Sequence, residues 1–569
     1  MNRWISSAGD ASSLVQMDYS NSTRHCYEPF LTWNPEVERY LSHAYGAERF
    51  SSTSKALTFP SRYSCIRVNT LHASVDDVVE KLQMILNEKR LETVSISKCQ
   101  IAGLDYVLFV QGSGPIAINY SCLPEANKKE VIVSRKCGEA VLRGAQVFVP
   151  GVMACSSHVE EGDRVAISVA IEKRGPSGQW AIPITRGTVL HGSQEDTYYY
   201  ERHGLYIGEG TTTMSRAGIF RAAEGIAVDV DTRVFSLPSL HDVLKGDIFL
   251  QNLPSIIAAH VLDPQRSDRI LDMCAAPGGK TTAIAILMKN QGEVIAIDRS
   301  HNKVLNIQKL ANEMGLTCIK AYKMDALKSV SRHNEVGDSV DSQYPDGWAL
   351  SKDNELHFDQ MCIHTDTGCD ESKDGKRYLS KALIRKTFRK MKNGPGRNQS
   401  LGPKAQKRNG FQQGSFDRVL LDAPCSALGL RPRIFVEQET IETLKHHALY
   451  QRRMFDQAVS LVRSGGVIVY STCTLNPGEN EALVRYALDR YKFLSLAPQH
   501  PKAGGPGLVG SYEWKNGYIE YAFLLSFIFY FYDLMHVLFI YFFLYFPFIE
   551  MEFQTWEIYY FLDRFFCLK

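Results

Sequence analysis

The chain contains 569 residues, 44% of them hydrophobic and 22% charged, which is enough for several domains with large buried cores. Its 64 basic and 62 acidic residues nearly balance, which excludes a uniformly basic nucleic-acid coat and an acidic disordered chain. The 13 cysteines form no CxxC pair, so we expect no disulfide framework and no metal site. No secretory signal opens the sequence, and a reducing, cytoplasmic location follows as the expectation.

The first region, residues 1–128, mixes helical and strand-like patterns and is predicted to be an N-terminal α/β region. Residues 37–45 and 75–87 carry apolar side chains at helical spacing, and residues 63–68 resemble a strand. The second region, residues 129–222, is richer in strand patterns. Within it, apolar residues alternate along the chain after a Gly-Asp turn, at Val165, Ile167 and Val169. This alternation predicts a small β-barrel.

The third region, residues 223–510, alternates strands with helices. We expect strands at 269–274, 293–298, 318–325, 416–425 and 466–473, with helices at 280–289, 302–314 and 437–463. Such alternation predicts an α/β fold with a doubly wound, mostly parallel sheet. A segment at about 329–415 is too long for a compact connection, and we interpret it as a disordered insertion. Its part at 373–408 has 13 basic residues and one acid, which suits either an RNA-attracting arm or a solvated loop.

A small-residue turn follows the first of these strands and leads into a helix. Its sequence, Asp272 to Thr281, reads DMCAAPGGKT. A phosphate-binding P-loop would need a glycine at the position of Cys274, so that interpretation fails. The backbone here permits a ligand to approach closely, and the helix N-terminus favours negative charge.

Acidic residues end the next two strands and favour a nucleoside ligand. Asp298 lies 19 residues after Gly279, where a carboxylate binds ribose hydroxyls in doubly wound folds. Asp325 ends the third strand, a suitable position for contact with an adenine edge. Each aspartate alone is more often a turn residue or a helix cap, and it is their combination at one sheet edge that indicates a nucleoside site.

Two cysteines lie at the ends of the fourth and fifth strands. Asp422 and Cys425 belong to LDAPCS, and Cys473 belongs to YSTCT. A single cysteine is usually a small packed side chain. Two cysteines at neighbouring strand ends, beside an aspartate, indicate a site of thiol chemistry.

These motifs resemble a known family. DMCAAPGGKT, LLDAPCSALG and YSTCTLNPGENE, together with RVNTL at 67–71, are similar to the Fmu/Sun (Nol-Nop-Sun) family of RNA cytosine-5 methyltransferases, over roughly residues 60–510. The resemblance implies a Rossmann-like domain that binds S-adenosylmethionine (SAM). Residues 129–222 resemble a PUA domain, an RNA-binding barrel, and this order of domains resembles the eukaryotic member that modifies tRNA.

The family pattern implies roles for individual residues. Cys473 would attack ring carbon 6 of a cytosine, Cys425 would assist release of the enzyme, and Asp422 would hydrogen-bond the base near nitrogen 3. Lys303 either lines the site or is a solvated helix lysine. The other residues implied in SAM binding are Cys274, Ala275, Ala276, Pro277, Gly278, Gly279, Lys280, Asp298, Asp325 and Asp422.

The implied substrate is an unstacked cytidine, with tRNA as the expected RNA, and we expect the enzyme to be a monomer. Two alternatives share the fold. One is a catalytically idle RNA-binding assembly factor, which the presence of both cysteines and Asp422 disfavours. The other is a DNA cytosine-5 methyltransferase, which would use the Pro-Cys thiol as its nucleophile and lack the PUA-like region.

The tail, residues 511–569, departs from the family pattern. The last 52 residues contain 22 of the 61 aromatic side chains, and residues 521–549 are long enough to span a bilayer. Three origins fit: an aberrant or alternative reading of the gene, a membrane anchor, or a divergent core element. If the family's last strand is missing, the sheet has an exposed edge, and we expect poor solubility.

Overall fold

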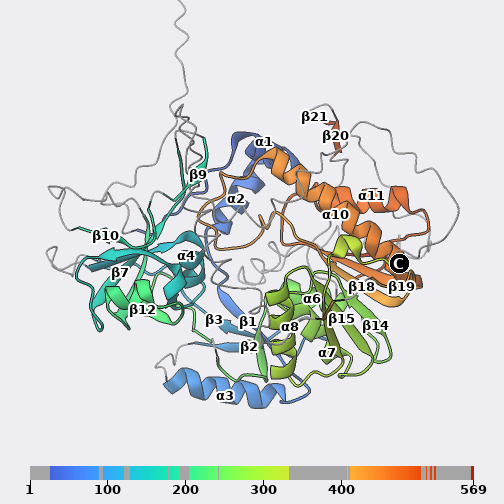
Figure 1. Cartoon of the computed structure of the whole chain (residues 1–569), viewed down its shortest axis with the longest axis horizontal. Helices are drawn as coiled ribbons and strands as arrows, with labels where there is room; N and C mark the ends of the chain where they lie inside the picture. Colours follow the sequence, from blue (N-terminus) through green and yellow to red (C-terminus); the bar gives the residue numbers. More distant parts are fainter. Residues whose placement is uncertain are drawn as a thin grey trace, which may run out of the picture. The chain divides into compact units, whose positions relative to one another are not determined.

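The protein is described by a computed structural model (Figure 1). The residues it describes are 26–88, 94–120, 129–175, 178–182, 184–191, 204–240, 242–331, 406–407, 410–501, 508, 513–515, 518–520 and 565–568. The basic insertion and the apolar stretch 521–549 therefore lie outside the described residues, apart from residues 406–407. In the described part, no helix combines the length and the apolar character needed to cross a membrane.

The third region supplies six strands of a seven-stranded sheet, and the tail supplies the seventh, in the order β17-β16-β15-β14-β18-β19-β22. All neighbouring strands are parallel except β19 and β22. The doubly wound, mostly parallel sheet is thereby confirmed. The strands are β14 (Arg269–Asp272), β15 (Glu293–Asp298), β16 (Ile319–Lys323), β17 (Gln406–Lys407), β18 (Phe416–Asp422), β19 (Val462–Ser471) and β22 (Phe565–Leu568).

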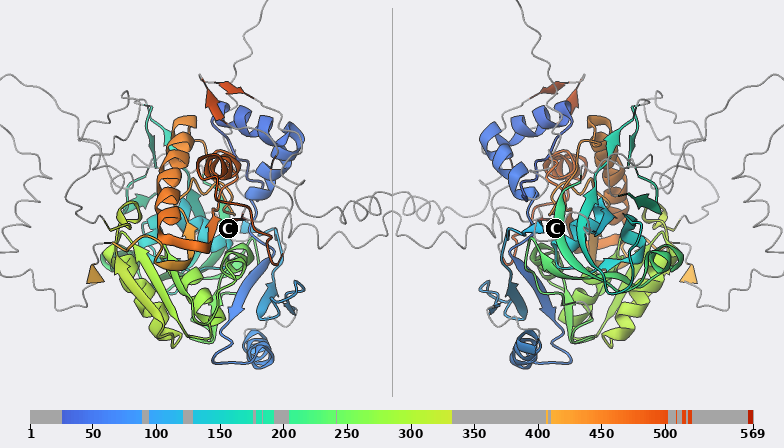
Figure 2. Two further views of the ribbon diagram at one scale, coloured as in Figure 1. Left: turned by 90° about the vertical axis from the view of Figure 1, so that its right-hand side faces the viewer. Right: turned by 90° about the vertical axis from the view of Figure 1, so that its left-hand side faces the viewer.

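Helices cover both faces of this sheet because alternate side chains of a strand point in opposite directions. Ile270 of β14 joins the core beneath α6 (Leu253–Val261), α7 (Gly279–Leu287) and α8 (His301–Glu313). Its neighbour Leu271 joins the opposite core, beneath α10 (Ile441–Leu461) and α11 (Glu481–Arg490). Figure 2 shows the sheet from two further sides, with α10 as the long orange helix. The central strands β14 and β15 are buried on both faces, which explains their continuous apolar runs.

The second region contains another seven-stranded sheet, in the order β10-β6-β4-β7-β11-β12-β5. Val165, Ile167 and Val169 of β7 share one core, but the residues between them are also buried, so β7 is covered on both faces. β12 pairs with β11, so this sheet extends past residue 222. Its strands are β4 (Lys129–Ser134), β5 (Val147–Phe148), β6 (Val152–Ser156), β7 (Arg164–Ala170), β10 (Thr188–Leu190), β11 (Tyr206–Thr212) and β12 (Ile226–Arg233). The short helices α4 (Arg135–Leu142) and α5 (Arg216–Arg221) accompany it.

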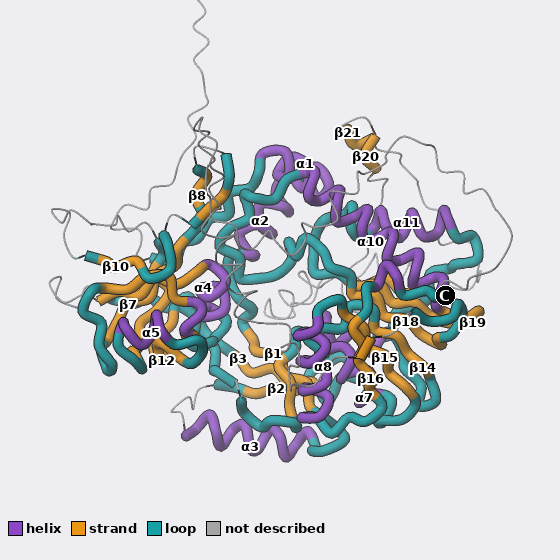
Figure 3. Tube along the Cα trace, in the orientation of Figure 1, coloured by secondary structure: helices purple, strands orange, loops and turns teal. Residues whose placement is uncertain are grey.

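The N-terminal region contributes a small sheet and two separate helices. The sheet has the order β13-β1-β3-β2, so β13 (Ile248–Leu250), which follows the second region in sequence, completes it. The other elements are β1 (Tyr63–Val68), β2 (Ile96–Lys98), β3 (Val107–Gln111), α1 (Pro35–Tyr45), α2 (Ala47–Leu57) and α3 (Val75–Glu88). α1 and α2 share an apolar core with Ile441 and Leu444 at the start of α10. Figure 3 shows the trace of these helices in purple.

Two features differ from the sequence-based expectation. The ends of the predicted insertion belong to the sheet domain, since Ser329 is fully buried and Phe411 lies in the core beside α10. The expected exposed sheet edge is also wrong for this structure. β22, at the end of the tail, pairs antiparallel with β19 from Ser471 to Ile468 and covers that edge.

Candidate active site

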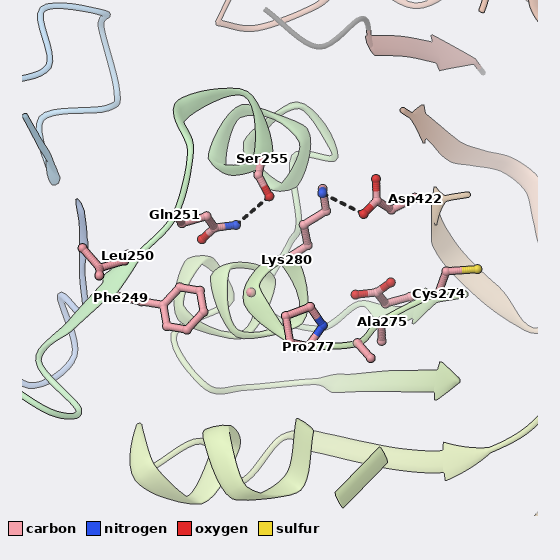
Figure 4. Close-up of a pocket in the computed structure, with 12 residues that line it drawn as sticks. Phe249, Leu250, Gln251, Ser255, Cys274, Ala275, Pro277, Lys280 and Asp422 are labelled. Atoms are coloured by element: carbon pink, nitrogen blue, oxygen red, sulfur yellow. Dashed lines mark hydrogen bonds and ion pairs between the residues drawn. The ribbon is translucent and has the colours of Figure 1, made fainter. Parts of the chain in front are cut away.

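A cavity of about 200 Å³ opens beside the carboxyl end of β14 (Figure 4). Its walls combine the turn after β14 with a segment from β13 into α6 and with the end of β18. The lining residues are Phe249, Leu250, Gln251, Ser255, Asp272, Cys274, Ala275, Ala276, Pro277, Gly279, Lys280 and Asp422. Seven of the residues implied in SAM binding therefore surround one cavity.

The two glycines of the turn have separate tasks. Gly278 adopts a φ of +107°, which side-chain-bearing residues rarely do, and it ends the turn just before α7. Gly279 lines the cavity, and a Cβ atom there would lie 3.0 Å from the ring of Phe249. Gly279 thereby leaves the cavity open to a ligand.

Asp272 supplies a buried carboxylate to the cavity wall. Its Oδ2 accepts a hydrogen bond of 2.8 Å from the hydroxyl of Thr281, while Oδ1 has no partner among the described residues. Burial raises the pKa of Asp272 to about 7. A buried acceptor without a partner is costly, and a cationic ligand group would satisfy it.

Lys280 and Asp422 join the cavity to the strand ends that carry the thiols. Lys280 Nζ lies 2.8 Å from Asp422 Oδ2, and the hydroxyl of Ser471 donates a bond of 2.7 Å to Asp422 Oδ1. Asp422 is thus held from α7 and from β19 at once. Its carboxylate has a fixed orientation at the boundary between the cavity and the two cysteines.

The two thiols are neighbours. Cys425 Sγ and Cys473 Sγ are 3.1 Å apart, and the backbone N–H of Cys473 donates to Cys425 Sγ over 3.4 Å. Both residues are half-buried. The hydrogen bond with Cys473 and burial hold the pKa of the Cys425 thiol well above its usual value. Cys425 therefore stays protonated at neutral pH.

Four predicted cofactor residues lie outside the cavity lining: Gly278, which ends the turn, and Asp298, Asp325 and Lys303. Asp298 accepts a bond of 3.0 Å from the backbone of Ser300, and Asp325 does the same for Leu327. Both are thus used as local caps, the simpler interpretation of each aspartate. Lys303 is exposed on α8.

Comparison with known proteins identifies the family. The family model for the 16S rRNA methyltransferases RsmB/F matches residues 259–342 and 399–505. A protein from Arabidopsis thaliana, rRNA (cytosine-C(5))-methyltransferase NOP2C, is 57% identical over 539 residues, covering 91% of this chain and 90% of that protein. The chain belongs to the RsmB/F (Fmu/Sun) family.

Other relatives of this RsmB/F member match most of its length. Human tRNA (cytosine(72)-C(5))-methyltransferase NSUN6 is 32% identical, and the alignment covers 85% of this chain and 87% of that protein. The crystal structure of NSun6 from Pyrococcus horikoshii with SFG, an analogue of SAM, superposes with a TM-score of 0.55 at 27% identity. It covers 84% of this chain and 92% of that one. SAM is the cofactor of the RsmB/F family.

The residues around the cavity suit SAM. A carboxylate with an available oxygen, at Asp272, matches a cationic amino group, and the open backbone at Gly279 permits close approach. Phe249 and Leu250 offer apolar surface on the opposite wall. These residues, with Lys280 and Asp422, would hold the cofactor, which supplies a methyl group when bound.

Sequence reasoning missed the second wall of the cavity. Arg67, from the RVNTL element, is only 1% exposed, and its guanidinium donates to Gln251 Oε1 over 2.9 Å and to Thr282 Oγ1 over 2.8 Å. It also lies 5.5 Å from the ring centre of Phe249. Burial lowers the pKa of Arg67 to about 10. Arg67 thus joins the N-terminal sheet to the wall that carries Phe249 and Gln251.

Proposed function

We propose that this enzyme transfers a methyl group from SAM to carbon 5 of a cytidine in RNA through a covalent cysteine adduct. The observation that carries the proposal is the pair of sulfurs 3.1 Å apart beside Asp422, at strand ends next to the cavity. Carbon 5 of cytosine is a weak nucleophile. A thiolate bonded to carbon 6 turns the ring into an enamine, which reacts at carbon 5.

Cys473 is the proposed nucleophile. It lies two residues after the end of β19, and its Sγ forms the bond to carbon 6 while electron density moves to carbon 5. By the family pattern, Cys425 of the Pro-Cys motif is assigned to release, where it favours loss of the carbon 5 proton. After methylation the carbon 5 proton passes to water and the bond between sulfur and carbon 6 breaks. Nitrogen 3 then gives up its proton, and the aromatic ring and the Cys473 thiolate return.

Asp422 is the proposed contact to the base. As the adduct forms, nitrogen 3 takes up the proton that the Cys473 thiol gives up, and a carboxylate beside that atom accepts its N–H hydrogen bond. Lys280 and Ser471 fix the carboxylate before the base arrives, so little reorganisation is needed. The base must leave its stack to reach these groups, which favours single-stranded or flipped cytidines.

We further propose tRNA as the substrate, acted on in the cytoplasm by a monomeric enzyme. Relatives named as tRNA methyltransferases match this chain over 83–85% of its length, beyond the sheet domain alone. Ribosomal RNA is the second candidate, because the relative at 57% identity is named as an rRNA methyltransferase. The β-rich sheet of the second region is the proposed PUA-like module for RNA backbone contacts.

The test is methyl transfer by the full chain to a panel of tRNA and rRNA transcripts with labelled SAM, followed by mapping of the modified position. We expect label on carbon 5 of a defined tRNA cytidine. Label found only in rRNA would identify the second candidate, ribosomal RNA, as the substrate. A protein that binds SAM and RNA yet labels no transcript would instead be an idle RNA-binding factor.

A further inference from the structure

A buried carboxylate lies behind the thiol pair. Glu479, in the loop between β19 and α11, is fully buried. Its Oε2 accepts hydrogen bonds from the backbone N–H of Ser426 over 3.0 Å and from Gln451 Nε2 over 2.7 Å. Its Oε1 accepts from the Ser426 hydroxyl and, over 2.9 Å, from Asn476 Nδ2. Four donors thus converge on one carboxylate.

These donors belong to both loops that carry the cysteines. Ser426 follows Cys425 directly, and Asn476 lies three residues after Cys473. The same Gln451 amide also donates to the carbonyl of Pro424 over 2.9 Å, so the Pro-Cys loop is held on both sides of its thiol. Glu479 therefore joins the two loops, in addition to the direct bonds between the hydroxyls of Ser426 and Thr474 and from the N–H of Gly429 to the carbonyl of Cys473.

The chemistry of the site requires an acceptor without protons. An ionised carboxylate has about four acceptor positions and no donor, which matches four converging N–H and O–H groups. An amide of the same shape would direct two N–H bonds at these donors. In a buried site such a conflict moves the loops, because water cannot replace the lost bonds.

We propose that Glu479 is a positioning residue that holds the Cys425 and Cys473 thiols in mutual register. Its consequence for catalysis rests on the proposed function, whereas its effect on the two thiols does not. A displacement of about 1 Å at a reacting group can cost about 100-fold in rate. A residue that only supports the packing of α11 would lower stability and leave the thiols in register.

The first test measures the thiol pair directly in the full chain. Dibromobimane becomes fluorescent once both of its arms have alkylated thiols, and the signal that Cys473→Ser removes reports this pair. We expect Glu479→Gln to slow that signal at least about tenfold. The matched control is Asp456→Asn. Asp456, on α10, accepts bonds from the hydroxyls of Tyr486 and Tyr491 and ties α10 to α11 away from the thiols.

The second test follows the reaction. In Glu479→Gln, adduct formation with transcripts containing 5-fluorocytidine should fall about 10-fold to 100-fold, with the Kd for SAM unchanged. Asp456→Asn should lose as much thermal stability as Glu479→Gln but should form the adduct at the wild-type rate. If Glu479→Gln does not fold, Ser426→Ala replaces it. That variant removes one of the four donors, and we expect a smaller slowing in the same direction.

The outcomes separate the two proposals. Bridging at the wild-type rate in a folded Glu479→Gln or Ser426→Ala variant overturns the role of Glu479, whatever the RNA assay gives. Slowed bridging in a chain whose wild type methylates no RNA supports the role of Glu479 and rejects the proposed function. If Asp456→Asn slows bridging as much as Glu479→Gln does, the slowing comes from a general loss of stability. That result would also overturn the assignment of Glu479.

Discussion

The two ends of the active site are built in opposite ways. At the carboxyl end of β14, the cavity has a bare glycine backbone and a carboxylate oxygen without a partner among the described residues. At the ends of β18 and β19, all four donors around Glu479 are paired, and the thiols touch. A site that must admit and release a cofactor needs open, unsatisfied groups. A pair of thiols that must keep its geometry needs a filled and fully bonded surrounding.

The largest expected effect is on methyl transfer, when the two thiols are substituted. Cys473→Ser should reduce methyl transfer to background, because an alcohol is a far weaker nucleophile than a thiolate. Cys425→Ser should accumulate a covalent protein–RNA adduct, visible as a slow band on a denaturing gel. If the adduct appears in Cys473→Ser instead, the roles of the two thiols are reversed.

The next largest effect is on SAM binding, when the cofactor cavity is narrowed. Gly279→Ala places a Cβ 3.0 Å from the Phe249 ring and should weaken SAM binding by about 1 kcal/mol, roughly fivefold in Kd. Calorimetry measures it. Gly218→Ala is the control, since its Cβ would meet Met214 at 3.1 Å in another part of the chain. Equal SAM affinity in the two variants would argue against the assigned cavity.

The affinity for SAM should also depend on pH, because a titrating carboxyl group lines the cofactor cavity. Because burial raises the pKa of Asp272 to about 7, its carboxyl is protonated below that pH and cannot balance a cationic amino group. SAM affinity should therefore rise between pH 6 and 7.5, by about tenfold at most. Asp272→Asn should bind SAM weakly and without this dependence. A dependence that survives in Asp272→Asn would assign it to another group.

The smallest effect concerns the contact between α1 and the thiol end. The hydroxyl of Tyr40 donates to Asn476 Oδ1 over 2.9 Å and accepts from the backbone N–H of Gly478 over 3.1 Å. Tyr40→Phe keeps the ring and should cost about 1 kcal/mol of the free energy of unfolding. Thermal denaturation measures it, with SAM affinity as the quantity expected to stay constant. An unchanged melting temperature would show that this contact from α1 does not stabilise the loop.

Much of the site followed from local sequence. The turn after β14, the cysteines and Asp422 lie at strand ends, and parallel strands bring their carboxyl ends to one sheet edge. This rule places Cys274, Lys280 and Asp422 together without further information. The same rule does not decide the role of Asp298 and Asp325, because it cannot distinguish a carboxylate that faces a ligand from one that caps its own turn.

The chain's sequence by itself determined the alternation of the sheet domain and the motifs at its edge, since both depend on residues near one another in the chain. Only the tertiary structure decided which distant groups meet. Arg67 reaches Gln251 and Thr282, Tyr40 reaches Asn476, and β22 closes the edge of β19. Buried polar groups and unpaired strand edges need partners, but their chemistry does not say which segment provides them. Packing of the whole chain makes that choice.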